Sequence, residues 1–487
     1  MKRDGFSSKF GMLAAAAGSA IGLGNIWKFP YITGQNGGAA FILVYLCCIA
    51  LIGLPIMMSE FVLGRKTQAN AAGSFKKIES EKPWFLTGHL AVATAFIILS
   101  FYAMIAGWVF SYIARSASGK LIAVAPDQLG SYFGNIISSG AEPMFWTFAV
   151  LAVTALIVIS GVKNGVEKYS KILMPLLVGI LVLLMVRSVT LEGASKGLEF
   201  LFKPDFSKLT TKGVLEALGH AFYSLSLGMG IILTYGSYVG SKENIFKLAL
   251  QVTIADTVIA LMAGVVIFPA VFAYGLEPAA GPSLIFITLP AVFAEMPFGA
   301  VFETLFFLLI GIAAVTSTIS LMEVVVAFVT EEFKMTRKKA TVLIASALFL
   351  LSIPSTLSFG VWSGVTVFGK NFFDLFDFIA SNIFLPLGGL FVCIFVGWVW
   401  GTKNAVDEIT SGGLYKFNYE RVYSVIIKFV APAAIVVIFL NSMGWLTKIV
   451  ESIKSVSPMF LGSAVVMFVV LVTWAVSFKN RMKRVNG

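Results

Sequence analysis

Stretches of apolar residues long enough to cross a bilayer recur along the whole of this 487-residue chain. A transmembrane helix needs about 20 predominantly apolar residues. Hydrophobic residues make up 58% of the sequence and charged residues 13%, a balance that excludes a soluble fold of this length. The sequence therefore predicts an all-α polytopic membrane protein of the cell (inner) membrane, with twelve spans near residues 10–34, 39–64, 84–114, 144–162, 169–187, 214–239, 245–275, 300–330, 338–354, 372–400, 425–445 and 458–478.

The distribution of basic residues predicts the topology. An even number of spans places both termini on one side, and we expect that side to be cytoplasmic. The inner segments then carry 24 Lys and Arg residues and the outer loops carry 10, as the positive-inside rule requires. This excess explains the net charge of +11 without nucleic acid as a partner. The three cysteines form neither a disulfide framework nor a metal-binding spacing.

Residues 11–36 contain the first span and make a poor helix in their middle. Gly18, Gly22 and Gly24 fall within seven residues, and a glycine costs about 1 kcal/mol relative to alanine in a helix interior. One interpretation is a broken span whose freed backbone groups bind ligands at membrane depth, where protein or a water-filled cavity covers them. The other is a kinked helix that uses small residues for close packing.

The sixth span, 214–239, is interrupted in a similar way by Ser224, Ser226, Gly228 and Gly230. Spans 1 and 6 would begin two halves of five spans each, and an odd number of spans gives the halves opposite orientations. Paired interruptions at corresponding positions are typical of transporters with inverted repeats. The predicted organisation is a cytoplasmic tail at 1–9, a first repeat at 10–190, an extracellular loop at 191–213, a second repeat at 214–400, accessory spans at 401–478 and a cytoplasmic tail at 479–487. We expect the outer stretches 115–143 and 188–213 to be ordinary loops.

Several motifs occur together in an order that is specific to one family. They are Gly18, Ala20 to Asn25, Phe29-Pro30 and Asn36-Gly37-Gly38 in and after span 1, Ser224 to Gly228 and Thr234-Tyr235-x-Ser237-Tyr238 in span 6, Gly197 to Phe206 in the outer loop, and Phe286 to Pro290. In these motifs the chain resembles the neurotransmitter:sodium symporter family, in its bacterial amino-acid-transporting branch. The resemblance implies an inverted 5+5 transmembrane helix repeat with broken helices 1 and 6, plus two accessory helices.

The resemblance also implies two sodium sites built from oxygen atoms, the ligands that hard cations prefer. The more peripheral site maps onto the backbone carbonyls of Gly18, Ile21 and Ala313 and the hydroxyls of Thr316 and Ser317. The site next to the substrate maps onto the Ala20 carbonyl and the side chains of Asn25, Ser224 and Asp256. Taken alone, the hydroxyls of Thr316 and Ser317 would more simply bond back to the preceding turn of their own helix.

Asp256 is the most informative residue, because an ionisable group at span depth is costly and indicates a functional site. The alternative is a carboxylate near the inner face that pairs with Lys242 or Lys247. Lys247 lies nine residues away, or about 13 Å along a helix, which is too far for a direct pair. Many family members have Asn at the matching position and use chloride nearby, so Asp256 would supply that negative charge itself. We also expect Asp256 to take up a proton for the return step.

The substrate residues are carried over from the resemblance. The N–H groups of Leu23 and Gly24 and the hydroxyl of Tyr102 would bind a carboxylate, and groups near Ala20, Tyr223, Ser224 and Ser226 would bind an amine. Monoamine carriers of the family have an aspartate where this chain has Gly22, which favours an amino acid. The expected side-chain pocket, suited to an apolar or aromatic group, consists of Ile98, Tyr223, Met229, Thr318 and Leu321. His220, where the family often has Gln, is expected to be a hydrogen-bonded core residue.

The resemblance places a gate on each side of the substrate. Lys28 and Asp377 match an outer ion pair, with Tyr102 and Tyr223 closing beneath it. Lysine lacks the fork of the arginine that the family often has there, so this gate is expected to be looser. The inner gate residues are Arg3, Phe6, Tyr238 and Glu331. In span 5, Gly165 and Pro175 would let the inner end unwind.

These observations predict a sodium-coupled, chloride-independent symporter that moves an amino acid into the cell by alternating access, as a monomer or a dimer. A proton-coupled amino-acid carrier of the same architecture is the alternative, and it would lack the hydroxyl pair Thr316/Ser317. The chain has no H-E-x-x-H or G-x-S-x-G motif, so an enzyme is not predicted. A channel would place repeated filters on a symmetry axis, whereas the two interruptions here are paired and antiparallel.

Overall fold

The computed structural model describes residues 5–276 and 281–446. Regular structure in these ranges is helical, apart from one β-bridge between Val367 and Lys370. The all-α prediction is therefore confirmed for them. The chain divides into two compact units, Met1–Val436 and Val437–Gly487.

Nine helices within the described ranges are long and apolar enough to cross a bilayer. They correspond to predicted spans 2–5 and 7–11, and several are continued by a turn of π-helix. The helices are α3–η2–α4 (Ala39–Cys48, Ile49–Gly53, Leu54–Thr67), α6 (Phe85–Ala117), α8 (Ala141–Ile159), η4–α9 (Val162–Glu167, Lys168–Val189), α13 (Ile245–Ala273), α15 (Gly299–Glu332), α16 (Arg337–Leu357), α17–η7–α18–η8 (Phe372–Asp377, Phe378–Phe384, Leu385–Ile394, Phe395–Val399) and α20–η9–α21 (Glu420–Val425, Ile426–Val430, Ala431–Ser442).

Spans 1 and 6 are both interrupted, as the sequence predicts. Span 1 consists of α1 (Lys9–Ala20), then η1 (Gly24–Lys28) and α2 (Phe29–Gln35), with a 49° bend at the break. Span 6 consists of α11 (Thr211–Ser224) and α12 (Ile231–Gly236). The window at 458–478 lies outside the described residues, so the count of twelve spans and the inverted repeat remain predictions.

The connections contain more helix than the sequence analysis expects. The stretches 115–143 and 188–213 are not ordinary loops, because each contains an amphipathic helix too short to form a 20-residue apolar window. The helices between spans are α5 (Ala71–Ile78), η3 (Pro126–Gln128), α7 (Leu129–Ser138), α10 (Ala194–Phe202), η5 (Phe206–Lys208), η6 (Leu284–Thr288), α14 (Leu289–Glu295) and α19 (Thr402–Ile409).

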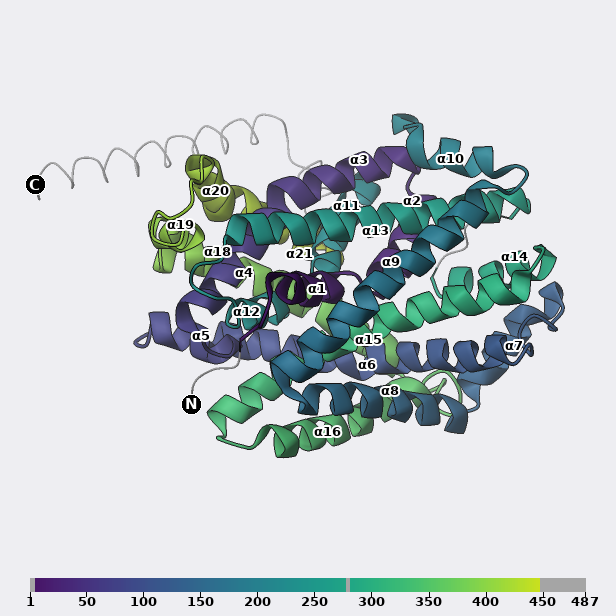
Figure 1. The fold of residues 1–487 in the computed structure, drawn as a ribbon, viewed down its shortest axis with the longest axis horizontal. Coiled ribbons are helices and arrows are strands. Elements are labelled where there is room, and N and C mark those ends of the chain that lie inside the picture. The colour runs from purple at the N-terminus through teal and green to yellow at the C-terminus, as the bar shows by residue number, and fades with distance from the viewer. Residues whose placement is uncertain (1–4, 277–280, 447–487) are drawn as a thin grey trace, which may run out of the picture. The chain divides into compact units, whose positions relative to one another are not determined.

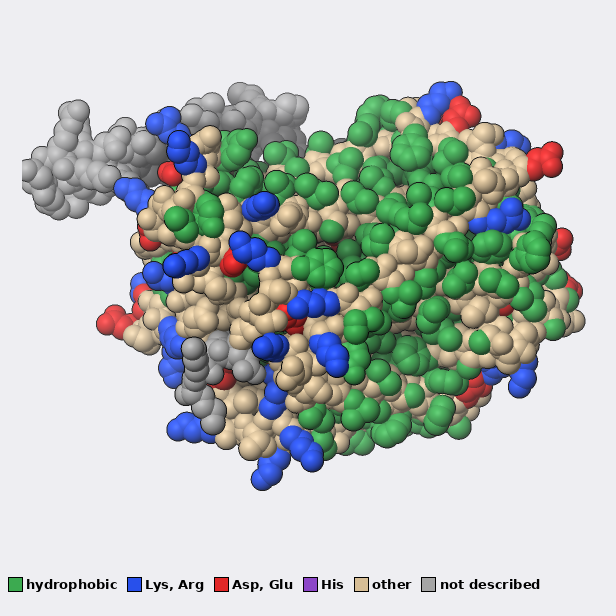
Figure 2. Space-filling view, in the orientation of Figure 1, with side chains coloured by type: hydrophobic (Ala, Val, Ile, Leu, Met, Phe, Trp, Pro, Cys, Tyr) green, Lys and Arg blue, Asp and Glu red, His purple; other side chains and the backbone are tan. Residues whose placement is uncertain are grey.

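Helices α6 and α15 form the centre of the first unit and pack along each other, with α8 and α16 to one side (Figure 1). Burial agrees with this arrangement, since 89% of the apolar window of α15 is buried, against 33% of that of α9. The outward side chains of α9 include Ile172, Leu183 and Val186. Figure 2 shows hydrophobic side chains over the broad face that α9 crosses, with Lys and Arg side chains gathered at the end that carries α5 and α19. Such a surface suits a protein surrounded by lipid.

Candidate functional site

The break in span 1 is short and does not depend on left-handed backbone. Helix α1 ends where Ile21 turns extended, at φ −76° and ψ 90°, and the helix resumes at Gly24. A Cβ on Gly22 would lie 2.5 Å from the Ser317 Oγ and 3.2 Å from the Tyr102 hydroxyl oxygen. A side chain at position 22 would therefore crowd Ser317 and Tyr102, and glycine lets span 1 approach α6 and α15 closely.

The break in span 6 is longer and does depend on left-handed backbone. Between Ser224 and Ile231, three residues have positive φ: Ser226 at 55°, Gly228 at 77° and Gly230 at 76°. The two glycines adopt this conformation readily. In a residue with a side chain, such as Ser226, this conformation is strained, and backbone strain of this kind is common at functional sites.

The two breaks lie against each other inside the unit. The Ser226 hydroxyl donates to the Ser19 carbonyl at 2.9 Å, and the Asn25 amide lies 3.4 Å from the Ser224 Oγ. Ser224 and Ser226 belong to span 6, and their partners Asn25 and Ser19 belong to span 1. The geometry thus matches the interpretation of residues 11–36 as a broken span rather than a kinked packing helix.

A cavity of about 30 Å³ lies between the breaks and the central helices. A space of this size holds one or two water molecules. Its lining includes all the predicted substrate residues except Thr318, and also Ser19, Ile231 and Ser317. The full lining is Ser19, Ala20, Gly22, Leu23, Gly24, Ile98, Tyr102, Tyr223, Ser224, Ser226, Met229, Ile231, Ser317 and Leu321. At its wall, the Leu23 N–H donates to the Tyr102 hydroxyl oxygen at 3.2 Å.

Thr318 does not line this cavity, which corrects the predicted pocket. Its hydroxyl pairs with that of Thr154 on α8 at 2.8 Å, in the buried contact between α8 and α15. Successive residues of an α-helix are rotated by about 100°. Ser317 and Leu321, one turn apart, therefore share the face toward the cavity, and Thr318 faces α8.

Asp256 is fully buried and forms a compact cluster with the two broken spans. Its Oδ1 accepts from the Asn25 amide at 2.7 Å and from the Ser224 hydroxyl at 2.9 Å. The Asn25 Oδ1 accepts the Gly22 N–H at 3.1 Å. The predicted alternative, a carboxylate paired with Lys242 or Lys247 at the inner face, does not fit this position.

The Asp256 cluster offers a carboxylate, an amide oxygen, a hydroxyl and nearby carbonyls. Among the residues of known placement, no group of three His, Cys, Asp or Glu side chains could hold a metal ion. Mixed hard oxygens with one negative charge suit a monovalent cation better than a transition metal.

The residues predicted for the peripheral sodium site also lie together. A Cβ on Gly18 would be 3.4 Å from the Thr316 Cβ, so α1 and α15 touch at this point. The Thr316 hydroxyl bonds back to the carbonyls of Ala313, at 3.0 Å, and Ile312, at 3.2 Å. A hydroxyl that donates to a carbonyl keeps an oxygen lone pair, so this back-bond is compatible with cation binding.

A larger cavity of about 190 Å³ lies on the other side of Tyr102 and Tyr223, and these two residues line both cavities. Lys28 and Asp377 line the larger one. Of the ion pairs between residues that the structure describes, none joins Lys28 to Asp377, so the outer gate stays a prediction. The Lys28 ammonium lies 4.5 Å from the centre of the Tyr223 ring, and Asp377 accepts from the Ser381 hydroxyl at 2.7 Å.

On the predicted inner side, Phe6 and Tyr238 are in contact, with ring centres 6.0 Å apart. The Tyr238 hydroxyl donates to the buried Glu323 at 2.7 Å, and Arg337 forms an ion pair with the same carboxylate. Glu323 and Arg337 were not identified from the sequence. Glu331 accepts the backbone N–H of Asn70 at 2.8 Å. Arg3, the fourth predicted gate residue, lies outside the described residues.

The start of span 5 is bound to the N-terminal segment. Glu167 accepts the Ser7 N–H and hydroxyl, both at 2.7 Å, and the Ser8 hydroxyl at 2.9 Å. Gly165 lies in the π-helical segment η4 and Pro175 inside α9. The inner end of span 5 is therefore helical here, and its unwinding remains a prediction.

His220 corrects a smaller expectation. It is buried, with Phe29 at 6.0 Å and Tyr45 at 5.3 Å between ring centres. Neither ring nitrogen has a hydrogen-bond partner within the part of the chain that is described. It is a core residue held by ring packing rather than by hydrogen bonds.

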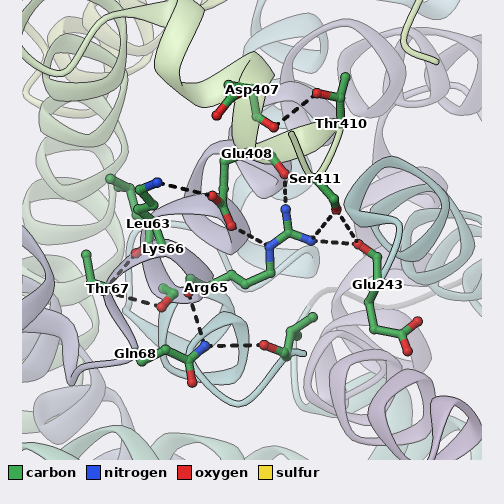
Figure 3. A network of polar contacts seen from close by, with 12 residues as sticks. Leu63, Arg65, Lys66, Thr67, Gln68, Glu243, Asp407, Glu408, Thr410 and Ser411 are labelled. Atoms are coloured by element: carbon green, nitrogen blue, oxygen red, sulfur yellow. Dashed lines mark hydrogen bonds and ion pairs between the residues drawn. The ribbon is translucent and has the colours of Figure 1, made fainter. Parts of the chain in front are cut away.

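A second polar network, which the sequence does not predict, lies around Arg65. Arg65, at the end of α4, is almost fully buried and donates to Glu408 Oε1 at 2.6 Å and to the Glu243 carbonyl at 2.6 Å (Figure 3). It also contacts the Ser411 hydroxyl at 3.2 Å and the Glu408 carbonyl. Arg65 thus joins the end of span 2 to the link after span 6 and to α19.

Replacing Arg65 with Ala should lower the free energy of unfolding by about 1.5–3 kcal/mol, because the partly buried Glu408 carboxylate and the carbonyls of Glu243 and Glu408 would lose their charged donor. Lys66 is the matched control. It lies 3.8 Å from the same carboxylate but is half exposed, so Lys66→Ala should cost less than about 1 kcal/mol. Chemical unfolding of the purified variants in detergent measures both, and equal losses would show that burial of Arg65 is unimportant.

Comparison with known proteins agrees with the fold and the motifs. The model of the sodium:neurotransmitter symporter family matches residues 3–125 and 135–484. The sodium-dependent transporter YhdH of Bacillus subtilis (strain 168) is 40% identical over 91% of this chain and 98% of its own length. A sodium-dependent transporter of Haemophilus influenzae (strain ATCC 51907 / DSM 11121 / KW20 / Rd) is 37% identical over the same shares.

Among solved structures, that of MhsT in complex with L-phenylalanine matches with a TM-score of 0.84 and 45% identity. The match covers 90% of this chain and 100% of that chain. This is a family of transporters and not of enzymes. By sequence, by fold and by its two broken spans, the chain belongs to the sodium:neurotransmitter symporter family.

Proposed function

We propose that this protein carries an amino acid into the cell together with sodium ions, by alternating access and without a requirement for chloride. The observation that carries the proposal is the meeting of two broken spans at a small cavity beside the buried Asp256 carboxylate. Exposed backbone at such breaks is what a transporter of this architecture uses to bind its substrate and ions. Twelve spans, an inverted repeat and cytoplasmic termini are part of the proposal.

Two sodium sites fit the oxygen atoms around the cavity. One consists of the Ala20 carbonyl with Asn25, Ser224 and Asp256. The other lies where α1 meets α15, around Gly18, Ile21, Ala313, Thr316 and Ser317. All of these residues are buried, so a bound ion would exchange its water shell for protein oxygens.

The proposed substrate is an amino acid with an apolar or aromatic side chain. Ile98, Met229 and Leu321 supply an apolar wall, and Met adapts to differently shaped groups. Gly22 brings no acidic side chain to the amine, so a ligand needs its own carboxylate to be neutral overall. The structural relative MhsT was crystallised with L-phenylalanine, which supports this class. A cavity of about 30 Å³ must widen to bind such a ligand.

Alternating access is supported by the two layers of contacts around the cavity. Tyr102 and Tyr223 separate it from the 190 Å³ outer cavity. Phe6, packed on Tyr235 and Tyr238, covers the inner side of span 6. Opening one layer while the other stays closed would expose the site to one side at a time.

Uptake into proteoliposomes tests the proposal. Each of the twenty amino acids is offered with an inward sodium gradient, with choline in place of sodium, and with a proton gradient alone. We expect uptake of apolar or aromatic amino acids with sodium, and a fall to the level of empty vesicles with choline. Uptake that needs only the proton gradient would favour the proton-coupled carrier and contradict sodium coupling.

Amines without a carboxylate should not compete for binding. Phenethylamine lacks the group that the Leu23 and Gly24 N–H groups and Tyr102 would bind, and it leaves a positive charge without a partner beside Gly22. Its inhibition constant should be at least 100-fold weaker than that of phenylalanine in a sodium-dependent binding assay. Phenylalanine amide, which keeps the rest of the molecule, is the control and should be equally weak.

A further inference from the structure

Ser320 lies one turn beyond Thr316 on α15 and lines neither cavity. Its hydroxyl donates to the Thr316 carbonyl at 2.9 Å and accepts from the Tyr235 hydroxyl at 2.8 Å. Ser320 and Tyr235 are each about 1% exposed. A continuous line of hydrogen bonds therefore runs from α12 to the turn of α15 that carries Thr316 and Ser317.

The other end of Tyr235 faces the N-terminal segment. Its ring meets that of Phe6 edge-on, with centres 5.8 Å apart and an interplanar angle of 79°. The Phe6 N–H donates to the Tyr238 carbonyl at 3.3 Å, which fixes Phe6 to the same helical end. Tyr235 is thus in contact with a predicted inner gate residue on one side, and on the other it is connected through Ser320 to Thr316 of the predicted peripheral sodium site.

A buried Tyr–Ser pair is not by itself unusual in this fold. Tyr423 and Ser59 form the same unit between α20 and α4, with 2.7 Å between their hydroxyl oxygens and a 2.9 Å bond from Ser59 to the Pro55 carbonyl one turn back. Neither of these residues lines either of the two cavities described above. Tyr235 differs from Tyr423 because it lies between the predicted inner gate residue Phe6 and the turn of α15 that carries the predicted peripheral sodium site.

We propose that Tyr235 and Ser320 are positioning residues that couple sodium binding at the peripheral site to closure of the inner gate; this inference rests on the proposed function. Bonds in such a chain polarise and strengthen one another, so the Tyr235 hydroxyl holds the Thr316–Ser320 turn in one geometry. When Phe6 leaves, Tyr235 loses its packing partner, the chain of bonds relaxes and the peripheral site binds sodium less tightly. Because coupling is reciprocal, bound sodium keeps Phe6 in place.

The test is the sodium dependence of amino-acid binding to purified protein. Tyr235→Phe removes one hydroxyl and keeps the ring, and it should raise the half-saturating sodium concentration roughly three- to tenfold, as expected for one buried hydrogen bond. The half-saturating amino-acid concentration at saturating sodium should stay within about twofold. Ser320→Ala should have the same effect, and the double variant should be no worse than either single one.

Phe6→Ala should shift the sodium curve in the same direction and show little added effect in combination with Tyr235→Phe. Tyr423→Phe is the matched control and should leave the sodium curve unchanged. Ser320→Ala carries the test if Tyr235→Phe does not fold. An unchanged sodium curve in the variants, an equal shift in Tyr423→Phe, or additive effects in the double variant would overturn the coupling while leaving sodium-driven transport intact. If amino-acid binding by the wild type did not depend on the sodium concentration, the proposed function would be overturned as well.

Discussion

Replacing Asp256 with Asn should reduce sodium-driven uptake at least tenfold in chloride-free buffer. Two sodium ions and a zwitterion bring two positive charges into a buried site, and at an effective dielectric constant of about 20 two unit charges 4 Å apart interact by roughly 4 kcal/mol. The carboxylate offsets part of that cost through its contacts with Asn25 and Ser224. Asparagine preserves the shape and one hydrogen-bond acceptor, but it removes the charge and replaces the other oxygen with an NH2 donor.

The wild type should keep its uptake rate when chloride is replaced by gluconate, because Asp256 supplies the negative charge. In the Asp256→Asn background, adding Ala260→Ser, one turn along α13 and buried, should restore uptake only when chloride is present. Glu303→Gln is the matched control, since Glu303 is a buried carboxylate of α15 outside both cavities. Wild-type uptake that halves in gluconate, or normal chloride-free uptake by Asp256→Asn, would make Asp256 a structural residue.

Replacing Gly22 with Ala should lower uptake to less than a tenth of the wild-type rate. The new methyl group would lie 2.5 Å from the Ser317 Oγ, too close for two nonbonded atoms, and would occupy a cavity of only about 30 Å³. The φ of Gly22 is not positive, so alanine fits the backbone and the effect comes from the side chain. Binding measured with radiolabelled amino acid should fall together with uptake.

Gly179→Ala is the control for this change. Gly179 is an exposed glycine within α9 where a Cβ meets no atom within 4 Å. Alanine there should leave uptake unchanged and favour the helix by about 1 kcal/mol. Near-normal binding by Gly22→Ala would mean that the amino acid lies elsewhere.

The sequence predicts the spans well because a bilayer imposes a length and a polarity on each of them. It also predicts both breaks, since a membrane helix rarely carries several Gly and Ser residues in succession without a reason. The sequence does not predict a second role of Gly22, which leaves room for the Ser317 side chain between span 1 and α15. The space between two packed helices depends on the tertiary fold, so the sequence of one helix does not predict it.

Two other features, the orientation of Thr318 and the burial of Arg65, also depend on tertiary contacts and could not be predicted from the sequence. Thr316, Ser317 and Thr318 are three hydroxyl residues in a row, and only the rotation of α15 against α8 decides that Thr318 faces Thr154. Arg65 looks from the sequence like any basic residue at the inner end of a span. Its partner Glu408 lies 343 residues away, and no local pattern connects them.

The separation of partners along the chain also has a consequence for biosynthesis. Asn25 donates to Asp256, which is 231 residues further on, and chains grow at about 5–20 residues per second. The first span is therefore made roughly 10–50 s before the carboxylate that completes its polar contacts. For that time its broken backbone lies in or near the membrane with its final partners not yet translated, a costly state in hydrocarbon. The first span is thus completed only after the seventh has been made, and a nascent chain halted before residue 256 would leave the Asn25 amide without its carboxylate partner.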